Sequence, residues 1–123
     1  MTVIDEQHRL QSLLEEMLGD KVQSVSVDPQ LAQPTPGKVA IVIEPPELEY
    51  TTWVGPPTIR WTLDVVAGTP ATQASSLDLI ADAIDTLAAK GLNIATASPA
   101  TFSLAGAGNL LAYQVRLNPL DLS

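Results

Sequence analysis

The residue types that catalysis uses most often are sparse in this sequence. His8 is the only histidine, it lies in a stretch with a helical pattern, and the chain contains no cysteine. Neither a Ser-His-Asp arrangement nor an H-E-x-x-H motif is present, so the sequence offers no recognisable nucleophile or metal site. A lone histidine on a helix is most often a surface residue. We therefore expect no enzyme activity, no catalytic residue, no cofactor and no bound metal.

Three aspartates have the spacing of one helix face. Asp78, Asp82 and Asp85 stand at positions i, i+4 and i+7 of a predicted helix, so their carboxylates share one side of it. The plain interpretation is a solvated face opposite the apolar residues of that helix. Like charges at this spacing repel each other by roughly a few tenths of a kcal/mol per pair, which disfavours a role in helix stability. A second hypothesis is therefore that this acidic face meets a basic partner or lines a passage where negative charge is useful.

Another group of candidate residues lies in a segment bracketed by prolines. Pairs of prolines at positions 45–46 and 56–57 enclose it, and it contains two of the five aromatic residues of the chain. Long loops in compact domains are often functional, and Trp and Tyr are enriched among interface hot spots. Either Trp53 folds back to cap the sheet, or the segment is a docking arm for a neighbouring subunit. The candidate interface residues of this arm are Tyr50, Trp53, Glu47 and Glu49.

Length and charge restrict the classes of function further. The chain has 123 residues, 46% of them hydrophobic, which predicts one domain over residues 1–123 with a single core. Its net charge of −8 disfavours binding to nucleic acid or to an anionic membrane. It has no apolar run near the ~20 residues of a membrane span and no signal-peptide pattern at its N-terminus. We expect a soluble protein that stays in the compartment where it is made.

The apolar periodicity indicates which elements must position these residues. It predicts, in order, a helix over 2–18, strands over 21–27, 38–44 and 58–67, a helix over 70–90, and paired strands over 92–104 and 111–117. The strand over 58–67 alternates most clearly, whereas the strand over 92–104 is expected to be kinked or interrupted at Pro99. A Pro-rich excursion occupies 44–58. Gly91 is expected to end the second helix, because glycine adopts the left-handed cap conformation.

This order of elements predicts an α+β fold. Two helices and four to five strands are most economically arranged as a two-layer sandwich, in which a mixed, predominantly antiparallel sheet is covered by both helices. The alternation around Trp61 predicts one packed face and one polar face of the sheet.

The layout of the chain resembles that of a known family. The runs Lys38–Ile43 and Arg60–Val66 flank a tyrosine-containing, Pro-rich excursion, and a helix and a closing strand at Leu111–Leu117 follow. In this layout, over almost its whole length, the chain resembles the tail terminator proteins of long-tailed (siphovirus-type) bacteriophages, particularly those of actinobacterial hosts. The likeness is one of layout and not of a diagnostic motif. Other head–tail connector proteins (a stopper or a tail-completion protein) and a small non-viral ligand-binding or interaction domain remain alternatives.

The resemblance implies a structural virion protein and not an enzyme. Such proteins form a homohexameric ring that caps the tail tube, stops its polymerisation and joins the head-side connector. The implied partners are other copies of the chain, the tail tube protein and the connector or stopper protein, while DNA passes without specific binding. The implied location is the head-proximal end of the tail in the virion, after synthesis in the host cytoplasm. In a ring, the docking arm is the candidate donor, and Asp78, Asp82 and Asp85 are candidates to line the lumen.

Overall fold

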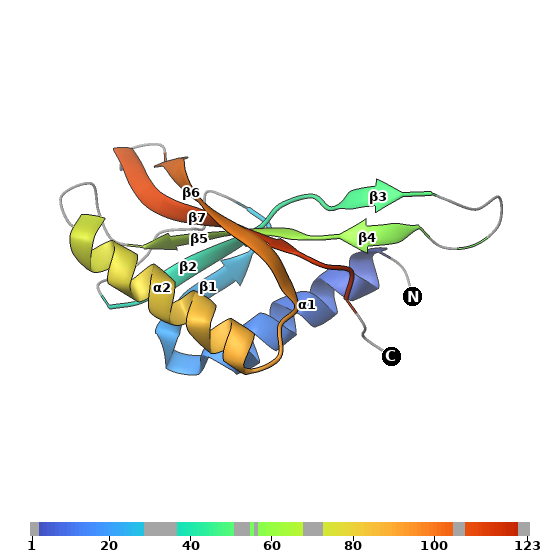
Figure 1. Cartoon of the computed structure of the whole chain (residues 1–123), viewed down its shortest axis with the longest axis horizontal. Helices are drawn as coiled ribbons and strands as arrows, with labels where there is room; N and C mark the ends of the chain where they lie inside the picture. Colours follow the sequence, from blue (N-terminus) through green and yellow to red (C-terminus); the bar gives the residue numbers. More distant parts are fainter. Residues whose placement is uncertain are drawn as a thin grey trace.

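The computed structural model describes residues 3–28, 37–50, 55, 57–67, 73–104 and 108–120 (Figure 1). Its elements in chain order are α1 (Val3–Leu18), a short 3-10 turn (Gly19–Lys21), β1 (Val22–Ser26), β2 (Val39–Ile43), β3 (Glu47–Glu49), β4 (Thr58–Arg60), β5 (Thr62–Ala67), α2 (Gln73–Ala89), β6 (Ile94–Leu104) and β7 (Gly108–Leu117). Neither described helix is both long and apolar enough to cross a membrane.

The main sheet contains five strands in the order β1-β2-β5-β7-β6. β1 and β2 run parallel, and the other three neighbouring pairs are antiparallel. Parallel neighbours cannot be joined by a tight turn. The loop that the sequence predicts between β1 and β2 falls mostly on residues 29–36, which lie outside the described residues. The predicted α+β fold with a mixed, mostly antiparallel sheet is confirmed.

Both helices cover the same face of the main sheet (Figure 1). Along α1 the fully buried residues recur at Leu10, Leu14 and Leu18, which is the spacing of one helix face. They belong to one core cluster with residues of α2 and of β2, β5 and β7. Every residue of β2 is buried, as expected for a strand inside a sheet. The members of this cluster on α2 and β5 are Ile80, Ala83, Leu87, Leu63, Val65 and Ala67.

The predicted strand over 58–67 is wrong in one respect, because the structure divides it at Trp61 into β4 and β5. β5 pairs with β2, whereas β4 pairs only with β3 in a separate two-stranded sheet. The cause lies in the segment that follows the neighbouring strand β2. The N–H of Glu44 still donates to the Thr62 carbonyl oxygen at 2.9 Å. Pro45 and Pro46 come next, and they have no N–H to continue the ladder.

The interruption expected at Pro99 is also absent. β6 spans Ile94–Leu104 and continues through Pro99, which lies opposite Tyr113 of β7. The irregularity in its pairing with β7 lies instead between Ile94 and Thr96. β6 is the outer strand of the sheet. A proline is tolerated there when its missing N–H would have pointed away from the neighbouring strand.

The predicted end of the second helix is confirmed. Gly91 has a φ of +99°, the Leu92 N–H donates to the Leu87 carbonyl at 3.0 Å, and the Gly91 N–H donates to the Ala88 carbonyl at 3.1 Å. This pair of bonds is a Schellman motif, in which glycine supplies the left-handed residue. Leu87 and Leu92 are both buried, so the motif also adds an apolar contact. The predicted starts of the helices, at Thr2 and at Thr69-Pro70, lie outside the described residues.

Candidate functional site

The proline-bracketed segment forms a two-stranded ribbon. We use "the ribbon" for β3 and β4, whose residues pair as Glu47 with Arg60, Leu48 with Ile59 and Glu49 with Thr58. In Figure 1 the ribbon extends to the right, away from the main sheet. The predicted excursion at 44–58 is therefore, in its described part, an ordered β-structure continuous with the strands that carry it.

Most of the predicted interface residues are exposed on the ribbon. The Tyr50 side chain, which follows β3, is 67% exposed and that of Leu48 is 40% exposed. Glu47 and Glu49 are exposed as well. Glu49 Oε2 lies 3.2 Å from Arg60 Nη1, so this carboxylate links the two strands of the ribbon. Trp53 lies outside the described residues, and the prediction that it caps the sheet or docks on a neighbour is not addressed.

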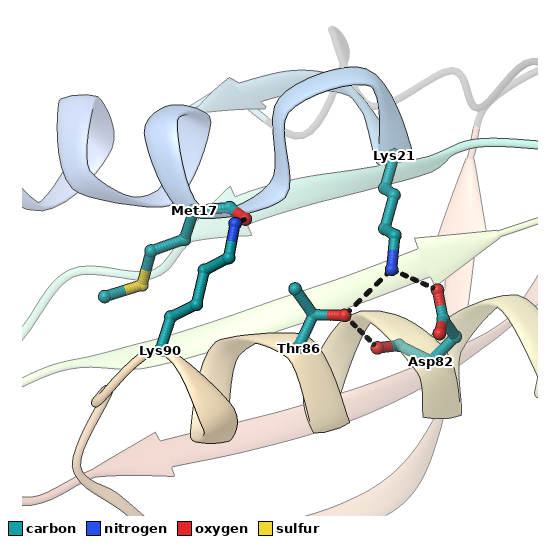
Figure 2. Close-up of polar contacts among 5 residues, drawn as sticks. All are labelled: Met17, Lys21, Asp82, Thr86 and Lys90. Carbon is teal, nitrogen blue, oxygen red and sulfur yellow. Dashed lines mark hydrogen bonds and ion pairs between the residues drawn. The ribbon is translucent and has the colours of Figure 1, made fainter.

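The three aspartates of α2 all lie at the surface, yet their surroundings differ. Asp78, Asp82 and Asp85 are exposed. Lys21 Nζ lies 3.0 Å from Asp82 Oδ2 and also donates to Thr86 Oγ1 at 3.0 Å (Figure 2). Asp82 is therefore a structural partner of Lys21 as well as a member of the predicted acidic face.

A second lysine also connects the two helices, through a contact with the last turn of α1. Lys90 Nζ donates to the Met17 carbonyl oxygen at 2.7 Å (Figure 2). Lys21 follows α1 and binds α2, whereas Lys90 follows α2 and binds the last turn of α1. Cations near the C-terminal end of a helix also interact favourably with its dipole. The pair fixes α1 against α2 through polar contacts at the surface.

The buried row of α2 includes a serine. Ser76 is fully buried and stands at the i−4 position from Ile80, which is also fully buried. Its apolar neighbour Leu77 is 43% exposed, so hydrophobicity alone does not identify the buried residue at this turn.

A groove lies where the ribbon joins the main sheet. It encloses about 600 Å³. Its wall combines the start of the ribbon with the polar ends of β5, β6 and β7. The polar and charged residues that line it are Glu44, Glu47, Arg60, Thr62, Thr96, Gln114, Arg116 and Asn118, and the apolar ones are Pro45, Pro46, Trp61, Ala95 and Leu117. The groove is therefore mixed in polarity and carries charges of both signs.

Beside this groove, two carboxyl groups are in contact. Gln114 Nε2 donates to Glu44 Oε2 at 3.1 Å, and Asp64, directly opposite Gln114 on the next strand, is hydrogen-bonded to Glu44. Burial raises the pKa of Asp64 to about 7, and the charge of Glu44 and the hydrogen bond with it contribute in the same direction. A carboxyl with this pKa changes its protonation state near neutral pH.

The sequence pattern does not indicate this pair. Asp64 stands in the predicted strand over 58–67 and Glu44 at the start of the predicted excursion, 20 residues apart in the chain. Their contact depends on the register that sets Val42 opposite Asp64. The available signal was the alternation itself, which puts Glu44 on the same face as Val42 and Asp64 on the same face as Thr62.

The remaining candidates add little. His8 is exposed on α1. Among the described residues, no three His, Asp or Glu side chains gather as a metal site would require. Comparisons with protein-family models, with curated proteins and with solved structures found no match to this chain.

Proposed function

We propose that this chain is a structural protein of a phage tail, a tail terminator that assembles into a ring at the end of the tail tube. The observation that carries the proposal is the ribbon, which extends from the body of the protein and bears the exposed Leu48 and Tyr50. Exposed apolar and aromatic side chains on an ordered extension are a common way to bind a neighbouring subunit. The occupant of this surface in the proposal is a second copy of the same chain.

A ring requires each subunit to donate one surface and to accept another. The ribbon is the donor, and the outer edge of β6 is the acceptor, since this edge strand is exposed over Ala95–Pro99. The opposite edge of the sheet is less available, because Gln11 Nε2 on α1 donates to the Val25 carbonyl of β1 at 2.7 Å. Donor and acceptor are different surfaces, so repeated contact produces a ring or a filament and not a two-fold dimer.

The charge of the chain is consistent with a ring around DNA. The net charge is −8, and Asp78 and Asp85 are exposed on α2 beside the Lys21–Asp82 pair. Carboxylates that face a lumen repel phosphate and let DNA pass without binding it. In this proposal the acidic face of α2 is turned toward the lumen.

The first test is the oligomeric state of the purified chain and of a ribbon variant. Native mass spectrometry and negative-stain imaging should show a six-membered ring, formed alone or on added tail tubes. Leu48→Ser combined with Tyr50→Ser should leave a folded monomer and lower ring formation at least about tenfold, because two exposed anchor residues are lost without any loss of core. The matched control is Leu77→Ser on α2, which removes a leucine of similar exposure away from the ribbon and should leave the ring intact.

Two outcomes would contradict the proposal. A chain that stays monomeric and does not bind tail tubes is not a terminator. A chain that forms rings and binds head-side connector proteins, with no affinity for tube, is instead a stopper.

A further inference from the structure

β6 is an edge strand with few of the features that usually protect an edge. It has 11 residues, whereas β1 at the opposite edge of the main sheet has 5. Soluble proteins commonly guard such edges with charged side chains, short strands or covering segments. No residue of β6 is charged, and Ala95–Pro99 are exposed. β6 is therefore the edge at which another strand can add.

The pairing of β6 with β7 shows which backbone groups of β6 point outward. In an antiparallel ladder, the N–H and C=O groups of successive residues point alternately toward the neighbouring strand and away from it. Pro99 has no N–H, yet regular pairs with β7 continue on both sides of it, over residues 96–104. Pro99 therefore occupies a position whose N–H would point outward. The N–H and C=O groups of Ala97 and Thr101, two residues away on either side, point outward as well.

The two faces of the sheet differ in polarity beside this edge. Ala97 lies opposite Val115 of the core cluster, so it is on the face that carries the helices. Thr96 lies opposite Arg116, on the other face. A strand that adds to β6 is therefore best matched when its apolar side chains lie on the helix side and its polar side chains on the opposite side.

β3 of the ribbon has this distribution of side chains. Leu48 lies opposite Ile59, which packs against the core cluster, so this side of the ribbon is apolar and continues the helix-covered face. Glu47 and Glu49 point to the other side, because side chains alternate along a strand. Among the described strands β3 pairs only with β4, so its outer edge is available for a further strand.

The charges of the two surfaces are complementary. The chain has 14 Asp and Glu residues, and none of them lies in residues 86–120, which include all of β6 and β7. The charged residues of that segment are Lys90 and Arg116, both cations. Residues 44–58 contain three glutamates and neither lysine nor arginine. In a chain with a net charge of −8, the surface of β6 and β7 is thus the one that suits an acidic strand from a second copy.

We propose that neighbouring copies of the chain associate by strand addition, in which β3 of one copy pairs along the outer edge of β6 of the next and forms hydrogen bonds with the backbone of Ala97 and Thr101. Leu48 of the added strand lies on the helix-covered side of the joint sheet, and Glu47 lies on the side of Arg116. Strand addition rests on the proposed function, since its donor and acceptor are the two surfaces of the ring. It specifies that the subunits are joined through their backbones as well as through the exposed side chains of the ribbon.

Variants of the edge test this pairing through the backbone. Thr101→Pro removes an outward N–H and should weaken association of the subunits at least about fivefold, because a hydrogen bond is lost and the proline ring meets the added strand. The matched control, Thr101→Ala, keeps the N–H and should associate as the wild type does. Pro99→Ala supplies an outward N–H without a risk to the fold and should tighten association about threefold or more. Native mass spectrometry over a dilution series measures the association of each protein.

Hydrogen exchange provides a second readout, in which the edge keeps its natural sequence. In the assembly the amides of Ala97 and Thr101 should exchange at least about tenfold more slowly than in the monomeric variant with Leu48→Ser and Tyr50→Ser. The amide of Ala100, which points to β7, should exchange slowly in both. Nuclear magnetic resonance of the dissolved samples, after exchange in the assembled state, resolves the individual amides.

Failure of this contact and failure of the ring give different results. If the wild type, Thr101→Pro and Pro99→Ala form rings equally well and the outward amides still exchange fast, strand addition is overturned and the terminator proposal stands. A wild-type chain that forms no ring and binds no tube overturns both. Protection of the Thr101 amide in chains bound to tubes as separate subunits, without a ring, would assign the edge to the tube protein and would also overturn the contact between copies.

Discussion

Aspartates of this chain have different roles because their surroundings differ. Asp64 is half-buried beside another carboxyl, Asp82 is at the surface in an ion pair with Lys21 at 3.0 Å, and Asp78 is exposed. An exposed ion pair such as that of Asp82 contributes roughly 0–1 kcal/mol to stability. Asp64 has the larger effect on how the free energy of unfolding depends on pH, because its ionisation is opposed by burial and by Glu44 together.

The first prediction at this scale concerns stability against pH in Asp64→Asn. The pKa of Asp64, about 7, lies above its ordinary value of 3.8, so the native state binds this proton more tightly than the unfolded chain. The contribution of Asp64 to the free energy of unfolding is therefore complete below about pH 4 and is lost as pH rises through about 7. At pH 8 Asp64→Asn should be more stable than the wild type by about 1 kcal/mol or more, a value reduced for the partial solvent exposure of the group.

Urea unfolding at a series of pH values provides the measurement, and the relevant quantity is the difference between the two proteins. That difference should grow between about pH 4 and about pH 7 and stay nearly constant above that range. Asp78→Asn serves as the control and should show a nearly constant difference from the wild type. A constant difference for Asp64→Asn would refute the assignment of the raised pKa.

Some site residues were accessible from the sequence and others were not. Tyr50, Glu47 and Glu49 were selected by composition and by their flanking prolines, and they are exposed on the ribbon. The Asp64–Glu44 contact was not accessible, because it depends on the register between two strands that no local pattern specifies. The partner of Asp82 was missed for the same reason, since Lys21 lies 61 residues away in the sequence.

Among the elements, α2 has the most completely defined end. Its last turn closes through the Schellman motif at Gly91, and a Cβ added there would meet no atom within 4 Å. The cost of a side chain is therefore conformational and not steric. A substitution at Gly91 therefore measures the cost of the backbone conformation without a contribution from packing.

A prediction at the element scale follows for Gly91→Ala. Alanine disfavours the left-handed conformation that Gly91 adopts at φ +99°, so the free energy of unfolding should fall by about 1 kcal/mol. Gly91→Asn should lose less, because asparagine tolerates this conformation better. Chemical denaturation of the three proteins checks the order, and equal losses for Ala and Asn would argue against the backbone explanation.

Elements with a strong local signal were predicted well, whereas their pairing was not. The helices and the strands β2, β6 and β7 follow from periodicity, and the end of α2 follows from Gly91. The division at Trp61 was missed because the alternation of residues 58–67 continues through it without interruption, while the change of partner is caused by prolines on another strand. The continuity of β6 was missed because a proline is compatible with an edge strand and not with an inner one, and sequence alone does not tell which strand is the edge.

At the scale of the whole molecule, the acidic surplus gives a prediction about DNA. In the proposed ring the variant with Asp78→Asn, Asp82→Asn and Asp85→Asn removes three negative charges from α2. Assembled rings of this variant should retain labelled double-stranded DNA at low salt, whereas wild-type rings should not, because repulsion of phosphate is weakened. Stability should change by no more than about 1 kcal/mol, since all three side chains are exposed.

The single variant Asp82→Asn is the control for this experiment, because it breaks the Lys21 pair and leaves the other two carboxylates in place. It should retain little DNA. Identical DNA retention by the wild type and the triple variant would show that the acidic face of α2 does not line the passage.

The position of β7 inside the sheet has a consequence for how the protein forms during synthesis. β7, at residues 108–117, lies between β5 and β6 and holds both. A chain growing from its N-terminus therefore makes α1, β1, β2, β5 and α2 before the strand that joins β6 to them exists. Until then β5 has an unpaired edge, which is prone to pair with other chains. This edge stays open from the synthesis of β5, which ends at Ala67, until β7 begins at Gly108, and aggregation of the nascent chain is favoured during that interval.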